Sequence, residues 1–406
     1  MAISTPVAHA QNSTKKPWLV GAICGTAVAF DGYDVVVYGA TLTSLREEWD
    51  LDPSTAGLVG SAALVGMLLG ALCVGPLSAR FGRRRTFIAA VAWFSILMVG
   101  CAAAPTAAIF AVLRILSGIG LGAVLPLAAA MTVEHAPLHR RNIAYVLMQT
   151  GFPVGGLAAA LVSMNVLPHH SWHWMYLFAG LPLVVVVLPA VLFLPESQEE
   201  PNSGGATGMA ALRMLLAPGT RLATVLFWAM SFCSLLFVYG ANTWLPTLMH
   251  DAGSTITKSL GFLLSFNAGA IVGGIFAGAA ADRWGSRPVV CASFLLGSAG
   301  VVAFAFTAAP DLLLALAAVT GYGAVATQTL INGWVTRHYP PEARTTGIGW
   351  SLGIGRLGAI AGPAVTGFIV AATGGGQMAF ILFACLAAVG AVLASQVRPH
   401  PEVQAA

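Results

Sequence analysis

Two carboxylates stand three residues apart in the apolar stretch AFDGYDVVVYG, residues 29–39. Because residues i and i+3 share one face of a helix, Asp31 and Asp34 can line the same cavity. Ionisable groups are costly in the hydrocarbon core of a membrane, which makes such a pair unusual. Two acids held close together away from water do not both ionise readily, so the pair is able to bind and release a proton. The alternative is a structural role, in which the pair caps a helix or forms salt bridges within a helical bundle.

Two arginines are the matching cations, since Arg114 and Arg356 also lie inside apolar stretches, one in each half of the chain. A guanidinium group binds a carboxylate through two parallel hydrogen bonds. No acid is evident deep in the second half, so we expect Arg356 to bind a carboxylate ligand. Arg114 either binds the ligand too or pairs permanently with one of the two acids. For Arg356 the alternative is an interfacial side chain that reaches out to the membrane surface.

Aromatic and amide side chains in the same stretches are further candidates for contact with a bound ligand. The candidates are Tyr33, Tyr38, Tyr239, Asn242, Trp244, Gln328, Asn332 and Trp350. The three amides are the stronger candidates, because an amide group is costly to place against lipid. Each of the aromatic residues also fits a role in packing or as an anchor at the membrane interface.

The composition sets the class of protein. The chain has 406 residues, of which 57% are hydrophobic and only 8% charged, whereas soluble domains carry about 25% charged residues. A helix needs roughly 20 apolar residues to cross a bilayer, and only helices or closed barrels satisfy their backbone groups in lipid. The sequence therefore predicts an all-α membrane protein with twelve transmembrane helices. The predicted spans are 18–41, 54–77, 86–104, 107–132, 143–164, 172–194, 221–248, 258–281, 288–308, 311–336, 344–371 and 376–396.

The basic residues predict how the chain crosses the membrane. Fifteen of the 19 Lys and Arg residues fall on the side that carries both chain ends, and only Arg46 and Lys258 fall on the other. Basic loops stay in the cytoplasm, so both termini are expected there. The net charge of +4 then reflects topology, and no nucleic-acid partner is expected. The six cysteines are scattered singly and predict free thiols, with no metal site.

A duplicated motif divides the chain into two halves. GPLSARFGRRRT begins at Gly75, and GAAADRWGSRPV begins at Gly278, 203 residues later. Two six-helix halves packed around a central site are the architecture of alternating-access transporters. The predicted organisation is a cytoplasmic tail (1–17), an N-terminal six-helix half (18–194), a flexible cytoplasmic linker (195–220), a C-terminal six-helix half (221–396) and a second cytoplasmic tail (397–406).

These features together resemble the major facilitator superfamily over nearly the whole chain. Within it, Asp31-Gly32-Tyr33-Asp34 and Arg114-x-Leu116-x-Gly118 are similar to signatures of the aromatic acid:proton symporters. The resemblance implies import of a benzoate-like or hydroxybenzoate-like anion, driven by protons, across a bacterial inner membrane. It implies no cofactor beyond the proton gradient. The expected partners are the small aromatic carboxylate, protons and the lipid bilayer, and the protein is expected to act as a monomer.

The resemblance implies that residues of the duplicated loops act as a gate between the two halves. The candidate gating residues are Ala79, Arg80, Gly82, Arg84, Glu134, Asp282, Arg283 and Arg287. The family pattern has an acid at position 79 that helps to lock the halves in the outward-facing state, but this chain has alanine there and keeps the acid in the second copy. Glu134 is expected to pair with an arginine of the loop 80–85, the alternative being a solvated charge.

Other functions are compatible with the same architecture. The chain could carry another organic anion or export drugs, although the spare cation Arg356 argues against export of cationic drugs. A receptor or sensor built on a transporter scaffold would normally bring a soluble signalling domain, and the predicted tails are short. An enzyme is not expected, because no nucleophile–base or metal pattern appears in any span or loop.

Overall fold

The computed structural model describes residues 17–137, 140–195, 213–306 and 310–397. Within these ranges the chain is helical and holds twelve helices long and apolar enough to cross a membrane, which confirms the predicted fold class. The two predicted tails and most of the predicted linker fall on residues 1–16, 196–212 and 398–406, outside the described residues.

The first half contains six spans, and two of them are interrupted. Its elements are α1 (Pro17–Trp49), α2 (Pro53–Phe81), α3 (Arg83–Ala102), α4 (Ala107–His135), α5 (Arg141–Gln149), α6 (Gly151–Val166), α7 (His173–Phe178), η2 (Leu183–Val187) and α8 (Leu188–Phe193). Helices α5 and α6 together form the fifth span, and the last three elements form the sixth.

The second half repeats this order with one interrupted span. Its elements are α10 (Arg221–Asp251), α11 (Ile256–Trp284), α12 (Ser286–Phe306), α13 (Pro310–Gly321), η3 (Tyr322–Ala326), α14 (Thr327–His338), α15 (Pro341–Thr373) and α16 (Gln377–Gln396). The π-helical turn η3 joins α13 to α14 within a single span.

Proline accounts for the interruptions in the first half. Pro153 lies in the first turn of α6, and Pro182 directly precedes the π-helical turn η2. A proline nitrogen has no hydrogen to donate to the carbonyl four residues earlier, so the helix breaks or widens there. Hydropathy alone does not reveal these breaks, because proline leaves the apolar run intact.

Helix α1 is longer than its predicted span, which ends at residue 41. It continues to Trp49 through two polar turns that a hydropathy pattern excludes. The extension is held by packing, since the Trp49 ring lies 5.4 Å from the ring of Phe110 on α4.

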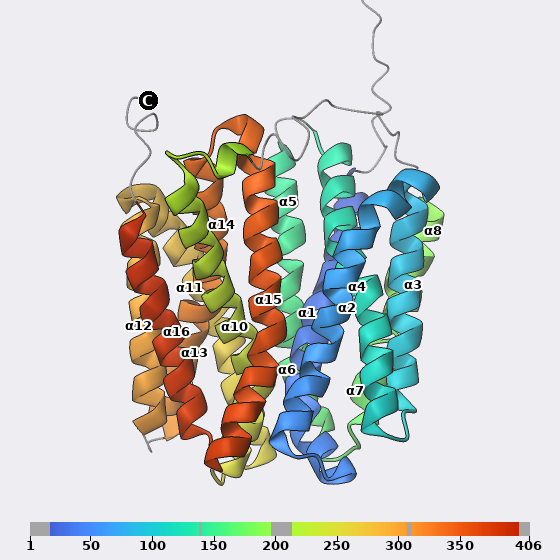
Figure 1. The fold of residues 1–406 in the computed structure, drawn as a ribbon. Coiled ribbons are helices and arrows are strands. Elements are labelled where there is room, and N and C mark those ends of the chain that lie inside the picture. Colours follow the sequence, from blue (N-terminus) through green and yellow to red (C-terminus); the bar gives the residue numbers. More distant parts are fainter. Residues whose placement is uncertain (1–16, 138–139, 196–212, 307–309, 398–406) are drawn as a thin grey trace, which may run out of the picture.

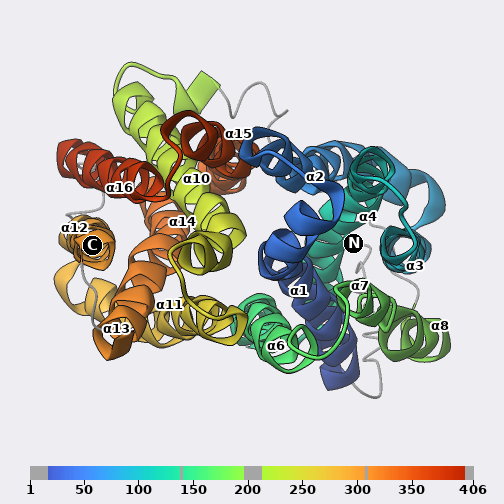
Figure 2. The same cartoon turned by 90° about the horizontal axis from the view of Figure 1, so that it is seen from below.

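The two halves stand side by side, with α2 next to α15 and α6 next to α11 (Figures 1 and 2). Small residues allow the closest approaches. A Cβ added to Gly39 on α1 would lie 2.0 Å from the backbone oxygen of Asn242 on α10. These two positions are 203 residues apart, which is the offset of the duplicated motif. The approximate two-fold axis that relates the halves therefore passes between them.

The halves are joined at the end of the bundle opposite to the start of α1 and the end of α16, here called the distal end (bottom of Figure 1). There Arg46 of α1 forms an ion pair of 3.1 Å with Asp251 of α10. The hydroxyls of Thr43 and Thr247 lie 3.2 Å apart one turn further in. Deeper still, the Ser61 hydroxyl of α2 donates to the backbone oxygen of Ile360 on α15 at 2.6 Å. The distal end is thus closed by polar contacts between the halves.

Candidate functional site

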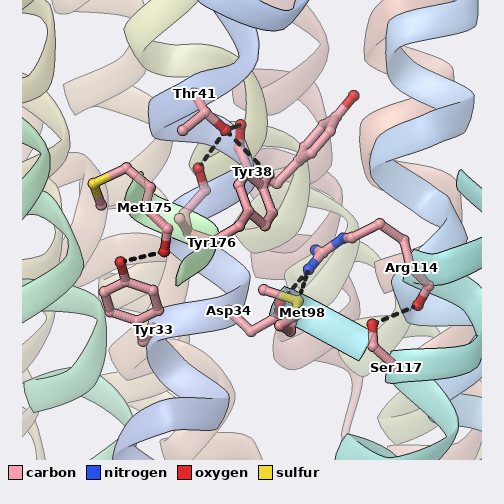
Figure 3. Close-up of polar contacts among 10 residues, drawn as sticks. Tyr33, Asp34, Tyr38, Thr41, Met98, Arg114, Ser117, Met175 and Tyr176 are labelled. Atoms are coloured by element: carbon pink, nitrogen blue, oxygen red, sulfur yellow. Dashed lines mark hydrogen bonds and ion pairs between the residues drawn. The ribbon is translucent and has the colours of Figure 1, made fainter. Parts of the chain in front are cut away.

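Asp34 and Arg114 form a buried ion pair between α1 and α4 (Figure 3). Their side chains are 1% and 2% exposed. The guanidinium also donates to the sulfur of Met98 at 3.4 Å, and its carbon lies 5.9 Å from the centre of the Tyr38 ring. The sequence left two roles open for Arg114, ligand binding or pairing with one of the two acids. In the structure it pairs with an acid of α1.

Aromatic rings close the distal side of this ion pair. The ring of Phe110 lies 5.1 Å from that of Tyr176 and 6.0 Å from that of Trp172. The Tyr176 hydroxyl shares a hydrogen bond of 3.1 Å with Thr41 (Figure 3). Such a cluster excludes water, and an ion pair away from water interacts strongly while being costly to break.

The two predicted tyrosines of α1 use their hydroxyls to hold neighbouring segments. Tyr33 donates to the backbone oxygen of Met175 at 2.8 Å (Figure 3), and Tyr38 donates to that of Ala56 at 2.6 Å. Both side chains are buried. In this structure the hydroxyls are therefore engaged in joining α1 to α7 and α2, and only the ring faces are left for a ligand.

Asp31 has a different environment from Asp34, although it is also only 1% exposed. Its Oδ1 atom has no hydrogen-bond partner among the described residues. Its strongest ionic neighbour is Arg356 of α15, and both charges also act on the phenol of Tyr239 on α10. The structure thus brings these three predicted residues together where the halves meet.

Arg356 is half-buried on the face of α15 that meets the first half. Its Nη1 atom lies 3.9 Å from the sulfur of Met67 on α2, the one hydrogen-bonding contact of this guanidinium within the described part of the chain. A thioether sulfur is a weak acceptor. The guanidinium is thus held at the junction while its donors stay available to a stronger acceptor. Met67 is a contact that the sequence pattern did not single out.

Asn242 and Trp244 lie on α10 close to the two-fold axis. The Asn242 amide donates to the backbone oxygen of Val238 at 2.9 Å and accepts from Asn267 of α11 at 3.3 Å. Trp244 is fully buried and donates to the backbone oxygen of Pro363 at 2.9 Å. These side chains hold α10 to α11 and α15. Asn267 was missed, although its place mid-span gives the same signal as that of Asn242.

Gln328 and Asn332 are one turn apart on α14 and hydrogen-bond to each other at 3.1 Å. They adjoin Ser231 of α10, a residue that the pattern did not single out because serine is common in apolar helices. Trp350 of α15 stacks on Trp228 with ring centres 5.5 Å apart and stays 40% exposed. Within the part of the chain that the structure describes, no contact joins Trp350 to the two amides.

The expected ion pair of Glu134 is present, and its partner is Arg83 at 3.0 Å. Arg83 belongs to the expected loop but was not among the selected gating residues.

The other gating residues of the first loop make separate contacts. Arg84 donates to the backbone oxygen of Val191 on α8 at 2.7 Å. The Arg80 guanidinium lies 5.3 Å from the ring of its neighbour Phe81. Gly82 makes the turn after α2 with a φ of +81°, a conformation that favours glycine.

In the second copy of the loop the equivalent positions are also in contact, but through other types of side chain. Asp282 lies 3.8 Å from Arg337, which also donates to Ser286 at 2.8 Å. Arg287 donates to the backbone oxygen of Ser395 on α16, as Arg84 does to α8. The guanidinium of Arg283 lies 5.7 Å from the ring of Trp284. Ala79, the counterpart of Asp282, is exposed on the last turn of α2.

Two six-helix halves that bury charged side chains at their junction define a secondary transporter. Comparison with known proteins agrees, and the chain belongs to the Major Facilitator Superfamily, whose profile matches residues 23–271 and 252–406. The superfamily and the relatives found are transporters, and the protein is a transporter and not an enzyme.

The relatives that the chain matches include transporters named for aromatic acids. A benzoate transport protein of Acinetobacter baylyi is 33% identical over 389 residues, 87% of this chain and 83% of the relative. A gentisate transporter of Corynebacterium glutamicum is 34% identical over 377 residues, 91% of this chain and 84% of the relative. Among solved structures, a D-xylose–proton symporter has the same fold with a TM-score of 0.81, at 18% identity over 94% of this chain and 98% of the symporter.

Proposed function

We propose that the protein imports an aromatic carboxylate of the benzoate or hydroxybenzoate class together with protons. It does so by alternating access, as a monomer in the bacterial inner membrane with both termini in the cytoplasm. The observation that carries this proposal is the buried Oδ1 atom of Asp31, which has no hydrogen-bond partner among the described residues, while its carboxyl interacts electrostatically with Arg356 where the two halves meet. The relatives named for benzoate and gentisate support the substrate class.

The proton is assigned to Asp31 because the other acid already has a partner. Asp34 is already neutralised by Arg114. A buried carboxylate without such a partner is costly, and protonation removes that cost. The charge of Arg356 offsets the charge of Asp31 while no substrate is bound.

The substrate carboxylate is assigned to Arg356, whose only described hydrogen-bonding contact is a sulfur atom. When a carboxylate forms two hydrogen bonds with this guanidinium, the cation no longer offsets the charge of Asp31. Asp31 then takes up a proton, so proton and substrate bind together. Because coupling between two ligands is reciprocal, protonation of Asp31 in turn favours substrate binding.

Transport by the purified protein in liposomes tests this proposal. An inside-alkaline pH gradient is imposed, and uptake of radiolabelled benzoate and 4-hydroxybenzoate is followed with and without a protonophore. We expect accumulation above the external concentration that the protonophore abolishes. Accumulation unchanged by the protonophore would rule out proton coupling.

A panel of competitors addresses the alternative cargoes in the same liposomes. Aliphatic carboxylates and cationic drugs are added in excess over the labelled benzoate. We expect aromatic carboxylates alone to compete. Competition by aliphatic acids would indicate a general organic anion transporter, and proton-driven exchange of cationic drugs would indicate a drug exporter.

A further inference from the structure

A groove of about 540 Å³ lies along α11 in the second half. Its walls are formed by residues of α11 between Gly273 and Trp284 and by Tyr322 of the π-helical turn η3. Arg283 is the one charged residue among the described residues that line it, and the others are glycine, alanine and aromatic residues. The groove therefore offers an apolar surface with a single cation near one end.

At the equivalent place in the first half, α2 and α4 pack backbone against backbone. A Cβ placed on Gly66 would lie 2.0 Å from the backbone oxygen of Ile115. One turn further, a Cβ placed on Gly70 would lie 2.0 Å from the backbone oxygen of Ile119. Helix α4 is a continuous α-helix along this contact. Two successive turns of α2 thus lie directly against the backbone of α4.

The second half keeps one of these two contacts and changes the other. The equivalent glycines, 203 residues later, are Gly269 and Gly273. A Cβ on Gly269 would lie 2.0 Å from the backbone oxygen of Ala318, whereas a Cβ on Gly273 would meet the ring of Tyr322 at 2.2 Å. Tyr322 begins the π-helical turn, and its hydroxyl lies 2.6 Å from that of Ser293 on α12. The ring therefore stands between the two backbones where the groove begins, and π-helical turns of this kind occur frequently at functional sites.

The groove opens on the outer side of α11, away from the junction of the halves. Helix α11 lies at the edge of the second half, between α13 and α6 (Figure 2). Its inner face carries Asn267, since a Cβ placed on Gly156 of α6 would lie 3.1 Å from the Asn267 Oδ1 atom. Phe276 follows Asn267 by nine residues, which is two and a half helical turns, and so lies on the opposite face. Phe276 and its neighbour Ile275 are both exposed, as expected of a surface that contacts lipid.

Arg283 brings a positive charge to the same outer face. It follows Phe276 by seven residues, about two turns and a rise of roughly 10 Å. Its guanidinium lies 5.7 Å from the ring of Trp284 and has no ion-pair partner among the described residues. The neighbouring acid Asp282 is already occupied, since it lies 3.8 Å from Arg337. Tryptophan and arginine at the end of a span are typical of the level of the lipid head groups.

We propose that this groove binds one anionic phospholipid, whose phosphate pairs with Arg283 while an acyl chain lies along the groove beside Phe276. Basic pockets between transmembrane helices on the cytoplasmic side bind lipid head groups in this way. A soluble phosphate would leave the apolar part of the groove empty, and a zwitterionic lipid carries a cation of its own that weakens the attraction to Arg283. The inference goes beyond the proposed function and does not depend on the cargo.

The internal repeat supplies a matched control. Arg80 is the equivalent of Arg283 in the first half, in the last turn of α2. Its guanidinium also lies close to an aromatic ring, 5.3 Å from that of Phe81. The two arginines thus share their charge, exposure and aromatic neighbour, but at Arg80 the adjoining helices pack backbone against backbone. If any arginine at the end of a span were enough to hold the lipid, substitution of either residue would have the same effect.

The test measures binding of phosphatidylglycerol and phosphatidylcholine with identical acyl chains to the purified full chain by native mass spectrometry. The variants are Arg283→Gln and Arg80→Gln. We expect the unsubstituted chain to bind its first phosphatidylglycerol about tenfold more tightly than phosphatidylcholine. This ratio should fall to about one in Arg283→Gln and remain about tenfold in Arg80→Gln. An excess of glycerol 3-phosphate should not displace the bound lipid, because it has no acyl chain.

Several results would overturn the inference. These are equal binding of both lipids by the unsubstituted chain, an unchanged ratio in Arg283→Gln, or an equal loss in Arg80→Gln. Displacement of the lipid by glycerol 3-phosphate would instead indicate a site for soluble phosphates. If Arg283→Gln does not fold, Ala280→Phe decides in its place, because a phenyl ring there fills the groove and leaves Arg283 intact. Tight binding of phosphatidylglycerol that persists in Ala280→Phe would show that the lipid does not lie in the groove.

Discussion

Asp31 and Asp34 lie one turn apart on α1 and are equally buried, yet only Asp34 has an ion-pair partner. Arg114 neutralises Asp34, whereas the Oδ1 atom of Asp31 has no hydrogen-bond partner among the described residues. Two acids that are equivalent in the sequence pattern therefore have different environments. We infer that one holds α1 to α4 and the other carries the proton, and substitutions can separate these roles.

The substitution Asp34→Asn is expected to destabilise the protein, because it leaves the charge of Arg114 buried without a counter-ion. Breaking a buried ion pair by removing one partner costs about 3–5 kcal/mol. Thermal unfolding of the purified protein in detergent measures this effect. The matched control is the double variant Asp34→Asn/Arg114→Gln, which removes both charges and should recover part of the loss. An unchanged unfolding temperature in Asp34→Asn would contradict a structural role for this pair.

The substitution Asp31→Asn is expected to leave the fold intact and to abolish proton-driven accumulation. The amide keeps the shape of the carboxyl but cannot bind and release a proton. Exchange of labelled for unlabelled substrate, which needs no net proton movement, should persist at a rate within about tenfold of the original. Liposome assays of accumulation and exchange measure the two activities separately. Full accumulation in this variant would assign the proton to another group.

The ion pair between Arg46 and Asp251 is expected to favour the state in which the distal end is closed. Because its side chains are 22% and 47% exposed, the pair is worth at most about 1 kcal/mol. Asp251→Asn should therefore shift the population towards distal opening by up to roughly fivefold. Spin labels attached at Asp50 and Ala252 report the distance across the distal end. Lys258→Gln removes a charge predicted for the same side and serves as the control, and an equal effect of both variants would rule out a specific contact.

Ala79→Asp is expected to raise transport and to favour the outward-facing state. An acid that accepts hydrogen bonds from the N-terminus of a neighbouring helix contributes about 0.3–1 kcal/mol, and up to ~2 kcal/mol when partly buried. In the second half the equivalent acid, Asp282, lies 3.8 Å from Arg337. The position equivalent to Arg337 in the first half is Glu134, whose partner is Arg83. A new aspartate is therefore expected near Glu134, and repulsion between the two acids places its effect at the lower end of this range.

Cysteine accessibility at the distal end, together with uptake in liposomes, measures the effect of Ala79→Asp. The neutral variant Ala79→Asn is the control for size and polarity. Equal labelling and equal uptake in the aspartate variant and the original chain would show that position 79 does not influence the gate in this protein.

The two copies of the gating loop show how far a sequence repeat predicts contacts. The offset of 203 residues pairs Arg83 with Ser286 and Glu134 with Arg337. Arg83 and Glu134 are in contact as an ion pair of 3.0 Å, and their equivalents Ser286 and Arg337 are in contact as a hydrogen bond of 2.8 Å from arginine to serine. The repeat predicts that these positions meet. It does not predict which of the two residues is the arginine or whether its partner is charged, because either an ion pair or an arginine–serine hydrogen bond can make the same contact.

The sequence by itself determined the class of protein, the twelve spans, the division into halves and the common face of Asp31 and Asp34. These features depend on composition, on apolar runs and on helical periodicity, which are local properties of the chain. Only the tertiary structure decided that Asp34 pairs with Arg114, that Asp31 interacts electrostatically with Arg356, and that the amide oxygen of Gln328 has no hydrogen-bond partner among the described residues. Such partners depend on how each helix is rotated and shifted against its neighbours. In a membrane this is set by the close packing of small residues and by pairing of buried polar groups across the whole bundle, which no single segment encodes.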